Sequence, residues 1–189
     1  KVNMEGYNKL VMSGHSKWSQ IRHKKAANDA KKGQVYGKLA RMITVAAREK
    51  GPDPNINPAL RVAIEKARTE NMPSDNVERA IKRASGGEKD SLTEVVFEAY
   101  CPGGIAILIT GITDNANRTS QEIKHILSEH GAKLAGPGSA KFLFGKTADS
   151  WQANSLIPVD ENTKEQLTKL FEALDDHDDV QDIFSNAEL

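Results

Sequence analysis

The spacing of apolar residues changes once along this chain, near residue 91, and the change separates two kinds of predicted structure. Before it, apolar residues recur every three or four positions, as they do on one face of a helix. After it, alternating and β-branched runs typical of strands are mixed with helical segments. We therefore predict a helical domain followed by an α+β domain within the 189 residues.

The helical part contains three amphipathic segments separated by turn-forming residues. We predict a three-helix domain over residues 13–88, with helices at 34–49, 58–71 and 75–84. Good helix formers indicate a further helix over about 22–32, with Gly33 as its break. Residues 1–12 contain neither a signal core nor a transit sequence. Because Met12 precedes a much more structured-looking sequence, we expect residues 1–12 to be a disordered leader or an upstream extension.

The second part predicts an antiparallel sheet covered by two helices, a ferredoxin-like α+β domain over residues 91–189. We predict strands at 93–100, 105–113, 139–144 and 179–185. Alternation in the last strand places Val180, Asp182 and Phe184 on one face.

Two helices and a linker complete this predicted domain. A capping box, Thr119 with Glu122, predicts the start of the first helix, and Gly131 its end. The second helix is expected over 160–175, and residues 145–156 are expected to be a linker.

Charge is distributed unevenly although the net charge is zero. Residues 1–90 carry 19 Lys or Arg and 10 Asp or Glu, whereas residues 91–189 carry 7 and 16. Ten of the cations lie within residues 13–50, beside only two acids. Such a basic helical segment predicts a polyanion partner, DNA or ribosomal RNA. Alternatively, the two halves neutralise each other by domain docking or in a homodimer.

We expect the basic arm and the first long helix to contact nucleic acid. Trp18 either stacks on a base or holds the arm on the helical domain, and His23 either donates to phosphate or serves as a structural donor. The candidate residues are Lys17, Trp18, Arg22, His23, Lys24, Lys25, Lys31, Lys32, Lys38 and Arg41.

A second polar patch is predicted at the junction between a strand and a helix. It consists of Asp114, Asn115, Asn117 and Arg118. The alternative is turn and cap chemistry, which Asn115 and Thr119 are suited to provide.

Other classes of function have little support in the sequence. The single cysteine, Cys101, excludes a disulfide framework and a cysteine-based zinc site, and it suits a cytoplasmic location. The chain contains no apolar run of 18 residues, so we expect no membrane contact. No paired carboxylates stand out, and no base lies near Cys101 in sequence, so we expect no enzyme, no metal and no cofactor.

Several ordered sequence blocks resemble the YebC/PmpR family over about residues 13–189. The blocks are GHSKW (14–18), HKKAA (23–27), DAKKG (29–33), NP-x-L-R-x-AIEKAR (57–68), NMP (71–73), EAY-x-PGG (98–104), TDN-x-NRT (113–119) and DDVQDIFSNAE (178–188). The resemblance implies a three-helix domain followed by α+β domains.

The resemblance also implies a function and points to one departure. It implies a DNA-binding transcriptional regulator, with a ribosome-associated translation factor that eases synthesis of proline-rich stretches as the alternative. Family members are longer, and we expect this chain to lack one small inserted module near residues 145–156. The alternative is that the protein has the module and that only this sequence omits it.

Overall fold

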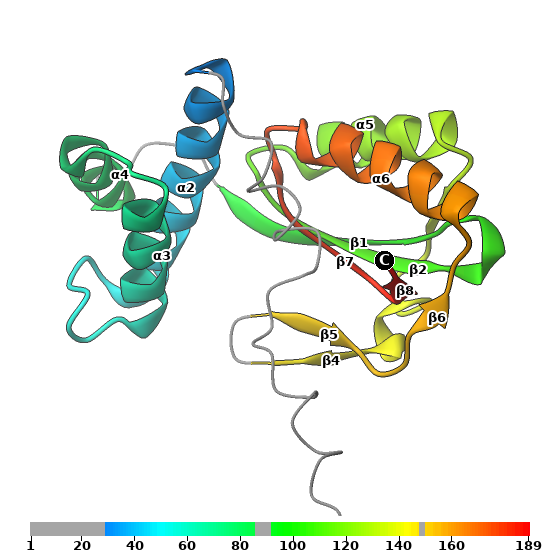
Figure 1. Cartoon of the computed structure of the whole chain (residues 1–189). Helices are drawn as coiled ribbons and strands as arrows, with labels where there is room; N and C mark the ends of the chain where they lie inside the picture. The colour runs from blue at the N-terminus through cyan, green and yellow to red at the C-terminus, as the bar shows by residue number, and fades with distance from the viewer. Residues whose placement is uncertain (1–28, 86–91, 148–149) are drawn as a thin grey trace, which may run out of the picture.

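The computed structural model describes residues 29–85, 92–147 and 150–189 (Figure 1). Its first part is a three-helix unit formed by α2 (Asp29–Lys50), α3 (Pro58–Thr69) and α4 (Ser74–Ser85). The three predicted helices are confirmed, but Gly33 does not break α2. Because no atom would lie within 4 Å of a Cβ at Gly33, this glycine is in open space and costs only helix propensity, about 1 kcal/mol. The part of the earlier predicted helix before residue 29 lies outside the described residues.

Small residues let the three helices approach closely. Alanines alternate with larger side chains in a core that includes Leu39, Ile43, Leu60, Ala63, Ala67 and Ala80. The turn between α2 and α3 is held by Asn57, which is fully buried. Its amide nitrogen donates to the carbonyls of Ala46 and Gly51, and its side-chain oxygen accepts from Leu60 N as the N-cap of α3.

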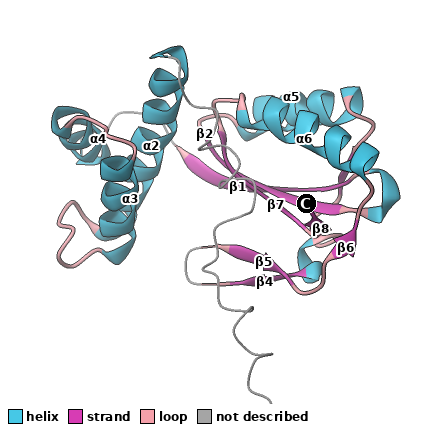
Figure 2. Cartoon of the chain, viewed as in Figure 1, coloured by secondary structure: helices cyan, strands magenta, loops and turns pink. Residues whose placement is uncertain are grey.

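A four-stranded antiparallel sheet forms the second part, in the order β3-β1-β2-β7. Its strands are β1 (Thr93–Tyr100), β2 (Ala106–Thr113), β3 (Lys133–Ala135) and β7 (Val180–Ser185). Helices α5 (Ala116–Glu129) and α6 (Glu161–Asp175) cover one face (Figure 2). The predicted α+β class, an antiparallel sheet of four strands covered by two helices, is confirmed.

A small hairpin covers part of the other face of the sheet (Figure 1). Strands β4 (Phe144–Lys146) and β5 (Trp151–Ala153) pack with Leu108 and Phe184 in a second apolar cluster. The remaining short elements are η1 (Pro102–Gly104), η2 (Lys141–Leu143), β6 (Ile157–Pro158) and β8 (Ala187–Glu188), and β6 pairs with β8 in parallel.

Two predictions in this region are wrong. The third strand of the sheet is 133–135 and not 139–144, since the Gly-Pro-Gly turn follows the strand instead of preceding it. The expected linker, 145–156, contains most of the β4–β5 hairpin. Strands β3, β4 and β5 have three residues each, too few to produce a recognisable alternation.

Helix α5 and strand β7 also differ in detail from the prediction. The helix begins at Ala116 with Asn115 as its N-cap, so Thr119 lies inside the helix and does not cap it. In β7 the register shifts so that Gln181 is an extra, bulged residue. Val180 therefore joins the cluster under the helices, whereas Phe184 joins the cluster on the opposite face.

Candidate nucleic-acid interface

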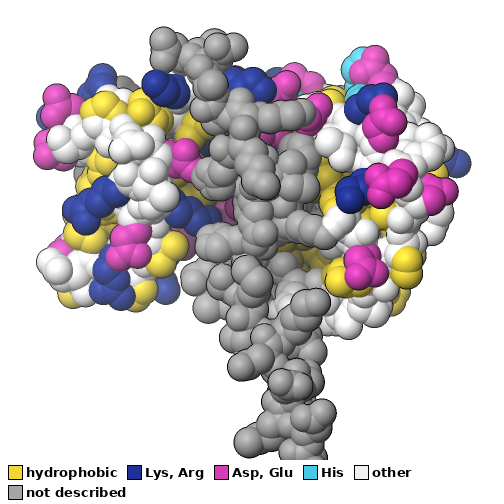
Figure 3. All heavy atoms as spheres, viewed as in Figure 1, with side chains coloured by type: hydrophobic (Ala, Val, Ile, Leu, Met, Phe, Trp, Pro, Cys, Tyr) yellow, Lys and Arg dark blue, Asp and Glu magenta, His cyan; other side chains and the backbone are white. Residues whose placement is uncertain are grey.

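Basic side chains cover much of the three-helix unit. Figure 3 shows several of them spread over its visible face. Nine of the cations on α2, α3 and α4 are exposed: Lys31, Lys32, Arg48, Lys50, Arg61, Arg68, Arg79, Lys82 and Arg83. The candidate residues before α2 lie outside the described residues: Lys17, Trp18, Arg22, His23, Lys24 and Lys25.

One basic stripe of α2 faces the α+β part. Gln34, Lys38 and Arg41 are three to four positions apart and so lie on the same side of the helix. That side meets the turn between α6 and β7, which contains four acids in residues 175–179. We call this segment the acidic turn.

Side chains of α2 bind both carboxylates and backbone carbonyls of the acidic turn. Lys38 donates to the carbonyl of Asp175, and its Nζ lies 3.4 Å from Oδ1 of the same residue. Gln34 Nε2 donates to the carbonyl of Asp176 at 2.6 Å. Arg41 donates to the carbonyl of Asp178, and the acidic turn thus accepts hydrogen bonds along two turns of the helix.

Asp179 is the buried centre of this contact, with 3% of its surface exposed. Oδ1 accepts from Arg41 at 2.8 Å, and Oδ2 accepts from Arg118 at 2.9 Å and from the Thr119 hydroxyl at 2.7 Å. Burial raises the pKa of the Asp179 carboxyl, but the hydrogen bonds from Thr119 and Arg118 and the charge of Arg41 outweigh burial and hold the pKa below its ordinary value.

His177 fixes the acidic turn to α5. Its Nδ1 accepts from the backbone N–H of Asp179 at 3.1 Å, so the other ring nitrogen, Nε2, carries the proton in the neutral ring. Nε2 lies 2.9 Å from Oε2 of Glu122 and can donate to it. The turn is therefore held from α5 as well as from α2.

Two of the predicted nucleic-acid contacts, Lys38 and Arg41, bind the acidic turn in this structure. The Lys38 side chain is buried, with 6% of the residue exposed, and Arg41 is directed at Asp179. Both cations point at the acidic turn, whereas a phosphate contact requires a cation directed at solvent. This arrangement corresponds to the alternative in which the basic and acidic halves neutralise each other by domain docking. Here the acids that Lys38 and Arg41 bind belong to the same chain.

The second predicted patch is an exposed helix start. Asn115 caps α5 through its side-chain oxygen, 3.1 Å from Arg118 N. Arg118 Nη2 lies 2.9 Å from Asp114 Oδ1 and also reaches Asp179. The carboxylate interactions raise the pKa of Arg118, first of all the hydrogen bond to Asp179. Asn117 is exposed beside them. Cap chemistry and ion pairing thus account for three of the four residues.

A trio of potential metal ligands lies at the same place. Among the described residues, Glu122, His177 and Asp179 bring one ligand atom each within 4.8 Å of one another. The Asp179 oxygens already bind two guanidinium groups, and that positive charge opposes a cation. The trio therefore forms part of an ion-pair network.

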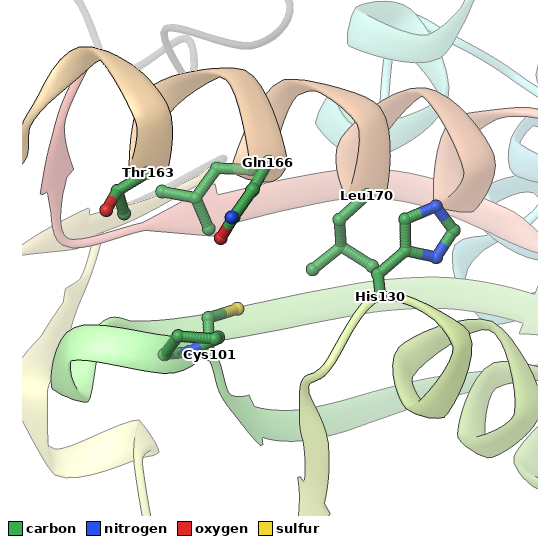
Figure 4. Close-up of a pocket in the computed structure, with 7 residues that line it drawn as sticks. Cys101, His130, Thr163, Gln166 and Leu170 are labelled. Carbon is green, nitrogen blue, oxygen red and sulfur yellow. The ribbon is translucent and has the colours of Figure 1, made fainter.

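Cys101 and His130 line a small cavity between the end of β1 and α6 (Figure 4). The cavity measures about 10 Å³, room for one water-sized molecule, and α6 contributes Thr163, Gln166 and Leu170. Burial raises the pKa of the Cys101 thiol to about 12, so it stays protonated and poorly nucleophilic.

Sequence reasoning missed the residues that receive the basic stripe. For the acidic segment Asp175 to Asp182, the sequence indicates a solvated face, a surface that binds a basic partner, or a surface that folds back on the basic half, and it does not say which residues make the contact. The available signal is a dense acidic run between an amphipathic helix and an apolar strand, where a buried carboxylate requires a cationic partner.

Among the described residues, no helix combines the length and apolar character that crossing a bilayer requires.

Family models match both parts of the chain. Residues 16–87 match the TACO1/YebC protein N-terminal domain. Residues 92–149 and 145–187 match the model described as the TACO1/YebC second and third domain.

Similar proteins span most of the chain. A probable transcriptional regulatory protein of Persephonella marina is 39% identical, with 94% of this chain and 96% of the relative covered. One from Petrotoga mobilis is 44% identical, with 94% and 71% covered. The crystal structure of the conserved hypothetical protein Aq1575 from Aquifex aeolicus has a TM-score of 0.82 and 32% identity, covering 92% of this chain and 97% of that one.

Proposed function

We propose that this chain, which belongs to the TACO1/YebC family, is a non-enzymatic regulator of gene expression that binds nucleic acid through its three-helix unit. Relatives that match 94% of the chain bear the name probable transcriptional regulatory protein, which supports DNA as the leading target. The proposal includes a cytoplasmic site of action.

The exposed cations of α2, α3 and α4 carry this proposal. Residues 29–85 hold 12 Lys or Arg and 7 Asp or Glu, and nine of the cations are exposed. Lys and Arg bind nucleic acid mainly through phosphates, which supplies affinity without reading the base sequence. Since Lys38 and Arg41 contact the acidic turn, we assign phosphate binding to the exposed cations, with Lys31 and Lys32 nearest in sequence to the predicted basic arm.

The absence of a catalytic role is part of the proposal. The Cys101 thiol has a pKa of about 12 and is buried, which argues against a nucleophile. The cavity beside it has room for only about one water molecule, so it suits no substrate.

Salt dependence of binding tests the proposal. A Lys24→Gln/Lys25→Gln/Lys31→Gln/Lys32→Gln variant should bind a DNA duplex with a log–log salt slope reduced by about 0.9 for each phosphate that the protein no longer neutralises. A Lys124→Gln/Lys169→Gln variant is the control, because it removes two exposed cations from α5 and α6. An unchanged slope in the first variant, or no DNA binding by the wild type in dilute buffer, would contradict the proposal.

Ribosomal RNA is the competing target. Backbone cations meet RNA as readily as DNA, and the exposed cations do not define a base-reading pattern. Competition distinguishes the two targets: DNA binding that survives an excess of ribosomal RNA supports transcriptional regulation. Salt-sensitive co-sedimentation with ribosomes, together with loss of DNA binding under competition, supports a translation factor instead.

A homodimer, in which the basic half of one copy meets the acidic half of another, is a separate proposal. The molar mass of the protein alone, measured by sedimentation, tests it.

We also propose that the chain lacks an inserted module found in longer relatives. The alignment with the Persephonella marina protein extends over 241 positions, more than the 189 residues of the chain. The two matches to the second and third domains overlap at residues 145–149, a segment that begins within β4. In a tryptic digest of protein from its native cell, a continuous peptide 147–164 is expected; its absence, with longer peptides adjoining Lys146, would contradict the proposal.

A further inference from the structure

One region of the acidic half carries more positive than negative charge. Residues 130–159 include Lys133, Lys141 and Lys146 and one acid, Asp149, which lies outside the described residues. In residues 91–189 as a whole, acids outnumber Lys and Arg by 16 to 7. This region is therefore an exception to the charge of its own domain.

Two of these lysines are held over an aromatic ring. Lys141 Nζ lies 5.2 Å and Lys146 Nζ 5.8 Å from the centroid of the Trp151 ring. Lys146 is directly opposite Trp151 in the β4–β5 pairing. Both lysines are exposed, and the described structure gives neither ammonium a carboxylate within salt-bridge distance. The ring positions the two charges without neutralising them, although the charge of Lys141 also acts on the Glu98 carboxylate and helps to lower its pKa.

An exposed aromatic ring lies beside these cations in sequence. Phe142 has 68% of its surface exposed, whereas its neighbour Leu143 packs against the apolar cluster under the hairpin. Hydrogen bonds hold the backbone at this ring and directly after it. Asn154 donates to the carbonyls of Phe142 and Leu143 at 3.1 and 2.9 Å.

A buried carboxylate fixes the turn that precedes this ring. Glu98 of β1 accepts from the N–H groups of Gly138 at 2.6 Å, Ala140 at 2.6 Å and Lys141 at 2.8 Å. The Phe142 ring therefore projects from a rigid backbone, which lowers the entropy cost of binding a flat ligand on it.

We propose that Lys141, Phe142, Lys146 and Trp151, here called the hairpin platform, bind single-stranded nucleic acid. An unpaired base stacks on Phe142, and the adjoining phosphates contact Lys141 and Lys146. Rings and cations in this combination are the usual means of binding single strands without sequence preference. A duplex offers no unstacked base to Phe142, so the platform discriminates against duplexes. The inference rests on the proposed nucleic-acid-binding function and adds a second, strand-selective contact to it.

Binding of a fluorescent 12-nucleotide oligouridylate, measured by anisotropy on the full chain in dilute buffer, tests the platform. Phe142→Ala should weaken binding about tenfold, because one base can no longer stack. Phe142→Tyr should bind like the wild type, because it keeps the ring. Lys141→Gln/Lys146→Gln should reduce the log–log salt slope by about 0.7 for each phosphate left without its lysine, whereas the Lys124→Gln/Lys169→Gln control should not.

Two further readouts separate this inference from the proposed function. None of the platform variants should change binding to a DNA duplex. In a Trp18→Phe background, Trp151 is the sole tryptophan, and oligouridylate should change its fluorescence as the lysines move toward phosphates. If Phe142→Ala binds oligouridylate like the wild type while the Lys24→Gln/Lys25→Gln/Lys31→Gln/Lys32→Gln variant shows the reduced salt slope on duplex DNA, the platform is wrong and the proposed function stands. If the wild type binds neither nucleic acid, both fail.

Discussion

Arg41 of α2 donates from Nη1 to Oδ1 of Asp179 at 2.8 Å, although 138 positions of sequence separate the two residues. The other oxygen of Asp179 binds Arg118 and Thr119 of α5. One buried carboxylate thus connects the three-helix unit, α5 and the acidic turn. Because such a carboxylate is desolvated, its partners must remain in place for the folded state to tolerate it.

Asp179→Asn should destabilise the protein by about 2–3 kcal/mol, since charge-assisted hydrogen bonds from Arg41 and Arg118 are removed, although Arg118 keeps its ion pair with Asp114. Urea unfolding at neutral pH measures the change. Asp176→Asn is the matched control, because it makes the same chemical change on an exposed neighbour. Equal stability of the two variants would show that the Asp179 network contributes nothing.

The same carboxylate predicts how stability depends on pH. Because folding lowers the pKa of Asp179, the stabilisation is fully present above the unfolded value, about 3.9, and is lost as pH falls through the folded value. The free energy of unfolding should therefore decrease on acidification below about pH 4 in the wild type. Asp179→Asn should show a shallower decrease than Asp176→Asn over the same range.

Asp175→Asn/Asp178→Asn should strengthen binding to a DNA duplex about fivefold. The change removes two negative charges beside the basic stripe and loosens the hold on Lys38, a gain of about 1 kcal/mol for two partly screened charges. Affinity at fixed salt is the measurement. Glu161→Gln/Glu165→Gln changes the net charge equally at the far end of α6, and an equal gain there would attribute the effect to net charge alone.

Elements with a long periodic pattern were predictable from the sequence, whereas those fixed by distant partners were not. The stripe of α2 and the alternation of β1 predict the observed elements, because each repeats its period over at least eight residues. Strand β3 has only three residues. The segment that follows it forms a turn because its backbone N–H groups donate to the Glu98 carboxylate. At the interface, sequence shows the charges of Lys38 and Arg41 but not which acids they meet. Thr119 resembles a cap in sequence, yet its hydroxyl binds Asp179, 60 positions away.

Gly111→Ala should destabilise the protein by about 1–3 kcal/mol through overpacking. A Cβ at this position would lie 2.7 Å from the carbonyl oxygen of Asp179 and 3.2 Å from Val95 Cγ2. The backbone oxygen cannot move without disturbing its hydrogen bond from Ile112 N, at 2.8 Å. Thermal unfolding measures the decrease in stability. Gly136→Ala is the control, since its Cβ would meet only Ser139 Oγ, at 3.6 Å, and a comparable decrease there would exclude the close approach as the cause.

Glu98→Gln should destabilise the turn that carries the hairpin platform. The carboxylate accepts from three backbone N–H groups, and an amide would turn its own donor toward one of them, a cost of about 1.5–3 kcal/mol. Urea unfolding measures the change, with Glu94→Gln as the control, because Glu94 is an exposed residue of the same strand.

The pKa of Glu98 gives a second test of the same interaction. Burial raises this pKa, but the N–H groups of Ala140, Gly138 and Lys141 outweigh burial and lower it below the ordinary value. These hydrogen bonds therefore stabilise the fold above the unfolded value, about 4.3, and their contribution disappears as pH falls through the lowered folded value. Glu98→Gln should flatten the acid limb of the stability curve, whereas Glu94→Gln should leave it unchanged. If the stability of Glu98→Gln decreased on acidification as steeply as that of the wild type, the turn would be held without the carboxylate.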